Sequence, residues 1–294
     1  MEQSWQPVET RLVPSRPIPH DLYVCLAKIK PRAAAFLRAA YQEGKPLPKN
    51  LAALHNGHLV AEYDFGETGA CWEGGPSIDF RDVLYVFSTT SLEEARSLVQ
   101  EDPFYREGII YQDTWFGWSI HVPPWKLASP KREGFEWLMR DVGILPTYPA
   151  GVTPRVIEKK VDVIPPTNMV VCFSKVDVAR VKQIEIDHKA GKNMPAYFIE
   201  HVYNRLGPGG TTQMGYDWES GPSDDQVYDL TIYSVNTVET ARQLRENDRF
   251  SRHGLFYDHR FFEWCIFTPY SKASPLYNAA LRRFLEGAGV KLGD

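Results

Sequence analysis

The feature that most constrains this chain is an internal repeat at an offset of 146 residues. The segment from Trp72 to Trp118 aligns without a gap with the segment from Trp218 to Trp264, and 19 of the 47 positions are identical. Chance alone would give only a few identities over such a window. A period this long indicates a duplicated domain rather than a solenoid of short units. The chain is therefore expected to hold two diverged copies of one folding unit.

The length and composition agree with two globular units. The chain has 294 residues, of which 43% are hydrophobic and 24% are charged, so each copy can build a core without disulfides or metal. We expect the first copy over residues 20–145 and the second over residues 168–294. The proline-rich residues 146–167 between them are typical of a linker.

Charge and hydropathy restrict the partners. The net charge is -4 and no basic block is present, which argues against nucleic acid. No apolar run is long enough to cross a membrane, and the first residues do not resemble a signal peptide. Four cysteines without metal-ligand spacing are interpreted as buried thiols. We therefore expect a cytoplasmic protein that acts on a small molecule.

The periodicity of each copy predicts the element order β-α-β-β-α-β, which is the ferredoxin-like arrangement. A further helix is expected after each of two Ser-Pro pairs, Ser129-Pro130 and Ser274-Pro275. Helices on one face of a four-stranded sheet leave the other face bare, and two such faces can bury each other. We predict an α+β protein whose two ferredoxin-like repeats form an intramolecular dimeric α/β-barrel, a pseudo-dimer within one chain. A further homo-oligomer stays open.

Short motifs in both copies resemble the YCII-related family. In the first copy the matching elements are Gly75-Pro76, Ser91 to Ala95, Asp102-Pro103-Phe104, Gly108 and Pro123-Pro124-Trp125. The second copy has Asp248-Arg249-Phe250 in place of Asp-Pro-Phe. The resemblance covers about a third of the chain. It implies the dimeric α/β-barrel superfamily, which includes muconolactone isomerase-like enzymes, a chlorohydroquinone dehydrochlorinase and cofactor-free monooxygenases. It also implies a His–Asp pair in a pocket between sheet and helices.

Two histidines, His55 and His201, occupy the same position in both copies. A neutral imidazole beside a carboxylate is suited to removing a proton next to a carbonyl group. Asp102 and Asp248 end a helix in each copy and are candidates to orient these histidines. The alternatives are a histidine that only packs on its helix and an aspartate that only caps a turn.

A second pair of candidate acid–base residues, Glu73 and Glu219, follows a tryptophan at the end of a strand in each copy. Aromatic surroundings can raise the pKa of a glutamate, although a strand-edge residue bonded to the backbone is the alternative. Candidate substrate-binding residues, each of which could instead belong to the core, are Trp72, Trp218, Tyr111, Tyr257, His58 and His121.

A metal site is not predicted. His55, His58 and Glu62 share one helical face, but the second copy lacks the last two, so the set exists only once. We also predict no cofactor. The favoured function is a cofactor-independent isomerase or lyase that transfers a proton on a small aromatic-derived or lactone-like acid. The alternatives are a non-catalytic binding or structural protein and, third, an oxygen- or haem-handling enzyme of the same superfamily.

Overall fold

The computed structural model describes residues 6–15, 17–19, 21–127, 131–149, 151–161 and 163–292. The first half contains the strands β2 (Leu22–Ile29), β3 (Cys71–Pro76), β4 (Asp82–Phe87) and β5 (Ile110–Trp118), and the helices α1 (Pro31–Gln42), α2 (Lys49–Glu67), α3 (Leu92–Glu101) and α4 (Pro103–Arg106). The second half contains the strands β7 (Met169–Val176), β8 (Asp217–Pro222), β9 (Tyr228–Tyr233) and β10 (Phe256–Trp264), and the helices α6 (Val178–Lys189), α7 (Ala196–Leu206), α8 (Val238–Asn247) and α9 (Arg249–Arg252).

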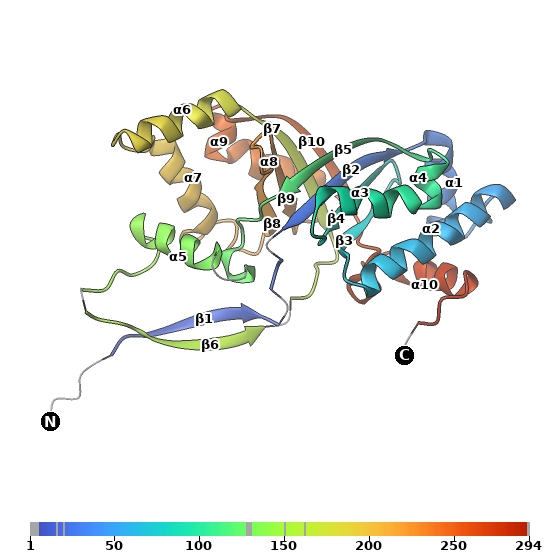
Figure 1. Ribbon diagram of the computed structural model, residues 1–294, viewed down its shortest axis with the longest axis horizontal. Coiled ribbons are helices and arrows are strands. Elements are labelled where there is room, and N and C mark those ends of the chain that lie inside the picture. Colours follow the sequence, from blue (N-terminus) through green and yellow to red (C-terminus); the bar gives the residue numbers. More distant parts are fainter. Residues whose placement is uncertain are drawn as a thin grey trace.

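Both halves form a four-stranded antiparallel sheet with the same topology. The strand order is β3-β4-β2-β5 in the first half and β8-β9-β7-β10 in the second. The helices of each half cover the outer face of its own sheet, so the two sheets lie between two helical layers (Figure 1). The predicted α+β class with two ferredoxin-like repeats is therefore confirmed.

Backbone bridges join the two sheets at both edges into one barrel. Trp118 bridges to Ser223 at one seam, and Ser77 bridges to Trp264 at the other. Gly75 and Gly221 lie at these seams, where a Cβ atom would come within 2.2 Å of the Cys265 carbonyl oxygen or 1.9 Å of the Ser119 carbonyl oxygen, respectively. Only glycine permits this approach, which explains why both copies keep it.

The inside of the barrel is one hydrophobic core built by both halves. Leu26, Val86 and Phe116 of the first half pack with Val171 and Ile232 of the second. Each strand gives alternate side chains to this core and to the helical layer outside it. The duplicated chain thus buries within itself the faces that a single repeat would leave exposed.

The helices α3 and α8, which follow the third strand of each sheet in chain order, begin at a side-chain cap. The Ser91 hydroxyl accepts a hydrogen bond from the Glu94 amide at 3.1 Å, and Thr237 does the same for Thr240 at 3.1 Å. The prediction that Ser274 caps the terminal helix is wrong, because that helix begins at Asn278 and the Ser274 hydroxyl accepts the Ile266 amide instead. The matching pair Ser129-Pro130 lies outside the described residues.

The predicted linker contains a strand. Residues 146–167 include β6 (Arg155–Val161), which pairs in parallel with β1 (Val8–Pro14) near the N-terminus. This two-stranded ribbon projects away from the barrel (Figure 1). The hydrogen bonds of each strand need the other one, which lies far away in the sequence.

The two terminal helices differ in their packing. α10 (Asn278–Gly287) lies beside α2 of the first half and buries Leu281 and Leu285 there (Figure 1). Its counterpart α5 (Lys131–Asp141) has no buried residue, and its Trp137 is 66% exposed. Among the described residues, no helix is both long enough and apolar enough to span a bilayer.

Candidate functional site

A histidine and an aspartate meet between the sheet and the helices of each half. His58 Nδ1 lies 2.6 Å from Asp102 Oδ2, and His201 Nδ1 lies 3.0 Å from Asp248 Oδ1. Each aspartate also caps the short helix that follows it, since its carboxylate accepts a backbone N–H two residues later, at 2.7 Å and 2.8 Å respectively. The two predicted roles of these aspartates, helix cap and histidine partner, are therefore combined in one side chain.

The histidine equivalent to His201 is His58, and the pairing of His201 with His55 is wrong. Lys28 and Lys175 are 147 residues apart, whereas His58 and His201 are 143 apart (201 − 58). The second copy therefore has four residues fewer before this helix. After this helix the second copy has three residues more, because the offset between the copies returns to 146 by the next strand. The helix α7 itself ends at Leu206, with Gly207 as its C-cap. The nearly equal offsets before and after the helix, 147 and 146 residues, concealed this shift.

His55 itself is a core residue with no carboxylate partner among the described residues. It is 2% exposed, and its Nε2 lies 3.1 Å from the Tyr41 hydroxyl. Its ring packs against Phe284 of α10 at 4.8 Å. Burial lowers the pKa of His55 to about 3, so the ring is neutral. The structure gives no support to a catalytic base at this position.

The pocket around His58 is closed. Its free volume is only about 20 Å³, because Tyr41, Phe80 and Phe267 fill it. Burial acts to lower the pKa of His58, but the charges of Asp102 and Glu62 outweigh it and raise this pKa to about 9. His58 therefore forms a charged, buried pair, and the pocket beside it is too small for a substrate.

The second half holds an open cavity of about 390 Å³ between its sheet and the helices α6 and α7. Its walls are mainly apolar, from Val176, Val181, Ile184, Met194, Phe198, Phe250, Leu255 and Phe256. Polar groups reach it from His201, Arg205, Asp229 and His121. The His201 ring is stacked on Phe250 at 3.7 Å between ring centres. A mainly apolar cavity with a few converging polar groups is typical of a small-molecule site.

The charges around His201 fix its protonated nitrogen. Burial acts to raise the pKa of Asp248, but His201, Arg245 and Arg205 outweigh it and hold this pKa far below its usual range. Asp248 is thus a carboxylate and can only accept, so Nδ1 of His201 carries the hydrogen. Within the described part of the chain, Nε2 of His201 has no hydrogen-bond partner. This nitrogen is free to contact a ligand.

Arg205 brings a guanidinium group to the cavity and lies four residues after His201 on the same helix. Its Nη2 donates to Asp217 at 2.8 Å, while its buried Nε has no hydrogen-bond partner among the described residues. Sequence analysis missed Arg205, although the spacing of four residues on one helix placed it on the face of His201.

His121 enters the second-half cavity from the first half, just after β5. Burial is the main reason that its pKa falls to about 4, so it is neutral. Of the predicted substrate-binding residues, His121 therefore adjoins the cavity of His201. Tyr111 lines a different pocket, and Tyr257 is 47% exposed on β10.

The glutamates and tryptophans meet elsewhere, in a polar centre inside the barrel. Lys272 Nζ donates to Glu73 at 3.0 Å and lies 3.7 Å from the centre of the Trp72 ring. The indole N–H of Trp218 donates to the other oxygen of Glu73 at 3.0 Å. A small cavity of about 190 Å³ adjoins this centre. The predicted acid–base glutamates and the histidines therefore do not share one site.

The other half of the polar centre repeats this arrangement. Lys126 Nζ donates to the Trp218 carbonyl at 2.7 Å, lies 3.6 Å from Glu219 and sits 3.2 Å from the centre of the Trp218 ring. Burial and the charge of Glu73 raise the pKa of Glu219 to about 7, and burial lowers that of Lys126 to about 8. The two lysines were not predicted from the sequence, although Lys126 and Lys272 are separated by the repeat offset of 146 residues. Most charges here are satisfied by one another, which favours a structural role.

A search of the described residues finds no group of three or more His, Cys, Asp or Glu side chains arranged to hold a metal ion. His55 and Glu62 both line the closed pocket of the first half, but Glu62 bonds to Tyr85 and His55 to Tyr41. His55 and Glu62 are therefore each bonded to a tyrosine of the core.

Comparison with known proteins gives distant likenesses only. A 5-chloro-2-hydroxyhydroquinone dehydrochlorinase from Burkholderia phenoliruptrix is 20% identical with a TM-score of 0.23, and the match covers 32% of this chain and 89% of that one. A heme-binding protein from Thermus thermophilus is 16% identical, with a TM-score of 0.42 and coverage of 92% and 100%. A mutant chlorite dismutase from Candidatus Nitrospira defluvii is 13% identical, with a TM-score of 0.47 and coverage of 90% and 95%.

No protein-family model and no curated protein matches the chain. The structural likenesses are too distant to carry an argument about activity. The fold is established by the strand pairing of the chain itself, and the function has to be argued from the site.

Proposed function

We propose that the chain is a YCII-related, cofactor-independent enzyme that transfers a proton on a small aromatic-derived or lactone-like acid. The observation that carries this proposal is the His201–Asp248 pair at the open cavity of the second half. The apolar walls suit a ring, and the guanidinium group of Arg205, which lines the cavity, suits a carboxylate. The first half keeps the same pair in a closed pocket and is proposed to be inactive.

The proposed chemistry follows from the hydrogen bonds. Nε2 of His201 takes a proton from the carbon next to a carbonyl group, and the imidazolium that forms is stabilised by Asp248 through Nδ1. The electron pair left on the substrate forms an enolate. Return of the proton to another carbon completes an isomerisation, whereas loss of a leaving group completes an elimination. Arg205 would hold the acid group in place.

The test measures proton exchange in heavy water. Purified protein is incubated with small unsaturated lactone acids and with halogenated hydroquinones, and proton NMR follows the loss of the exchanging signal. We expect exchange in the wild type and a loss of about 100-fold or more in His201→Gln, which removes the base. His58→Gln serves as the matched control and should keep the activity, because its pocket is closed.

Three results would contradict the proposal. Exchange that survives His201→Gln would exclude His201 as the base. Binding of these compounds without any exchange would favour the alternative of a non-catalytic binding protein. A Soret absorption band in the purified protein would indicate a haem-handling enzyme instead.

A further inference from the structure

A fourth pocket, of about 460 Å³, opens between the start of α1, the turn before β4 and the edge of β10. Four basic side chains line it: Lys28, Arg38, Arg81 and Arg260. Two acidic side chains, Asp79 and Asp82, join them, so the lining carries a net charge of +2 (4 − 2). The whole chain has a net charge of -4. A positive pocket in a negative protein concentrates anions at this one place.

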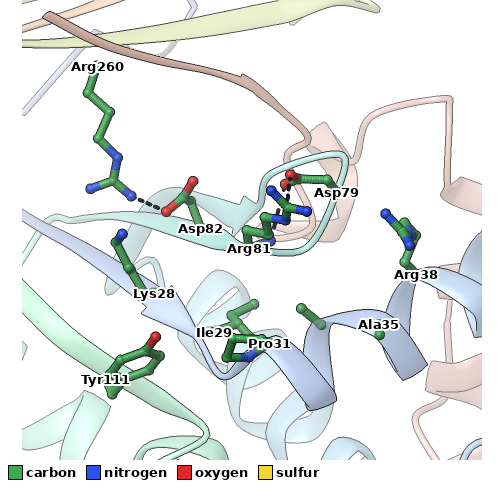
Figure 2. A pocket seen from close by; sticks show the side chains of 11 residues that line it. Lys28, Ile29, Pro31, Ala35, Arg38, Asp79, Arg81, Asp82, Tyr111 and Arg260 are labelled. Carbon is green, nitrogen blue, oxygen red and sulfur yellow. Dashed lines mark hydrogen bonds and ion pairs between the residues drawn. The ribbon is translucent and has the colours of Figure 1, made fainter.

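Not all of these cations are neutralised within the protein. Arg260 is paired with Asp82, and Arg81 lies 3.4 Å from Asp79. Lys28 and Arg38 form no hydrogen bond or ion pair with any described residue. In Figure 2, Lys28 extends from β2 on the side of Asp82 and Arg260, and Arg38 stands on α1 at the opposite end of the pocket. The two unpaired cations therefore frame the space between them.

The start of α1 adds to this positive potential. The first turn of α1 contains no acidic residue, and no side chain among the described residues caps it. Pro31 and Ala34 of this turn line the pocket, so the positive end of the helix dipole adjoins the space and no acidic residue of the first turn offsets it.

The fold does not require these charges. At the repeat offsets of 146 and 147, Arg81, Arg260 and Arg38 correspond to Val227, Thr114 and Glu185. Only Lys28 has a basic counterpart. The second copy therefore builds the same elements without the basic cluster. The cluster is thus a feature of this pocket and not of the duplicated scaffold.

We infer that this pocket is a second ligand site, distinct from the cavity of His201, and that it binds the phosphate or diphosphate group of a small molecule. A single carboxylate needs one arginine, whereas guanidinium groups from three segments and a helix N-terminus suit a group with several charged oxygens. The site needs no chemical step, and its occupancy is independent of the reaction proposed above.

The test is isothermal titration of the full-length protein with inorganic pyrophosphate at low ionic strength. We expect saturable binding with one site. Arg38→Gln and Arg81→Gln should each weaken it about tenfold, which is a typical effect of one charge-assisted contact. Both side chains are exposed, so both variants are expected to fold.

Lys175→Gln is the matched control, because Lys175 is the counterpart of Lys28 and lies on β7, away from this pocket. It removes the same charge and should leave the affinity within about twofold of the wild type. The inference is overturned if wild-type binding is not saturable, if Arg38→Gln binds as tightly as the wild type, or if Lys175→Gln weakens binding as much as Arg38→Gln does.

Discussion

At the scale of single residues, the buried aspartates show how one side chain serves fold and chemistry together. Asp102 and Asp248 each cap a short helix and hold a histidine, and both are largely buried. The contact with a backbone N–H fixes the carboxylate, so the imidazole is fixed as well. The difference between the halves lies in the surroundings of the histidine, which are closed by aromatic rings at His58 and open at His201.

His58 should make stability depend on pH. Its folded-state pKa of about 9 lies above the ordinary value of 6.5, so its stabilising contribution is complete below pH 6.5 and is lost as the pH rises to 9. We expect the unfolding free energy of the wild type, relative to His58→Gln, to fall by on the order of 2 kcal/mol across this window. Urea denaturation at a series of pH values measures it.

The control for this prediction is His188→Gln, since His188 is exposed near the end of α6. Its difference from the wild type should vary little over the same pH range. Parallel pH profiles for the wild type and His58→Gln would show that His58 is not charged in the folded protein.

At the scale of elements, one pair of helices decides which pocket is open. α10 crosses to the first half, and its Phe284 contacts both Tyr41 and His55. α5 buries no residue, and its Phe135 contacts His121 at the border of the second cavity. The unequal packing of two duplicated helices thus closes one pocket and leaves the other accessible.

This difference predicts unequal mutational costs. Leu285→Ala on α10 removes a side chain that is 2% exposed, so we expect a loss of about 2–4 kcal/mol of unfolding free energy. Trp137→Ala on α5 removes a larger side chain that is 66% exposed, and we expect a change below about 0.5 kcal/mol. Chemical denaturation of both variants measures these costs, and equal costs would contradict the packing described for α10 and α5.

At the scale of the whole molecule, the two repeats share one core and should unfold together. The barrel interior mixes side chains from both sheets, and the seams are closed by backbone hydrogen bonds such as His121 N–H to Ser220 O at 2.8 Å. Neither sheet can expose its inner face without exposing the other one. We therefore expect the pseudo-dimer to unfold as a single cooperative unit.

Native-state hydrogen exchange can test this cooperativity. Ile232→Ala in β9 creates a cavity in the shared core and should cost about 2–4 kcal/mol. We expect the amides of β2 in the first half to lose as much protection as those of β7 in the second. Unchanged protection in β2 would mean that the halves unfold independently.

The sequence alone determined the duplication, the element order and the barrel. These conclusions rest on the offset of 146 residues, the hydrophobic periodicity and the glycine-proline corners. Local backbone geometry and close backbone contacts restrict which residue types can occupy a position, so these features can be recognised in the sequence. They also located Asp102 and Asp248, because a cap and its following helix are neighbours in the chain.

Only the tertiary structure decided which side chains meet. It replaced His55 by His58, because nearly compensating length changes on either side of one helix alter the overall offset by only one residue. It separated Glu73 and Glu219 from the histidines, since both glutamates belong to the polar centre of the barrel, whereas the histidines lie between the sheets and the helices. It also opened one cavity and closed the other. These outcomes depend on contacts between distant segments, and such contacts leave no local pattern to read.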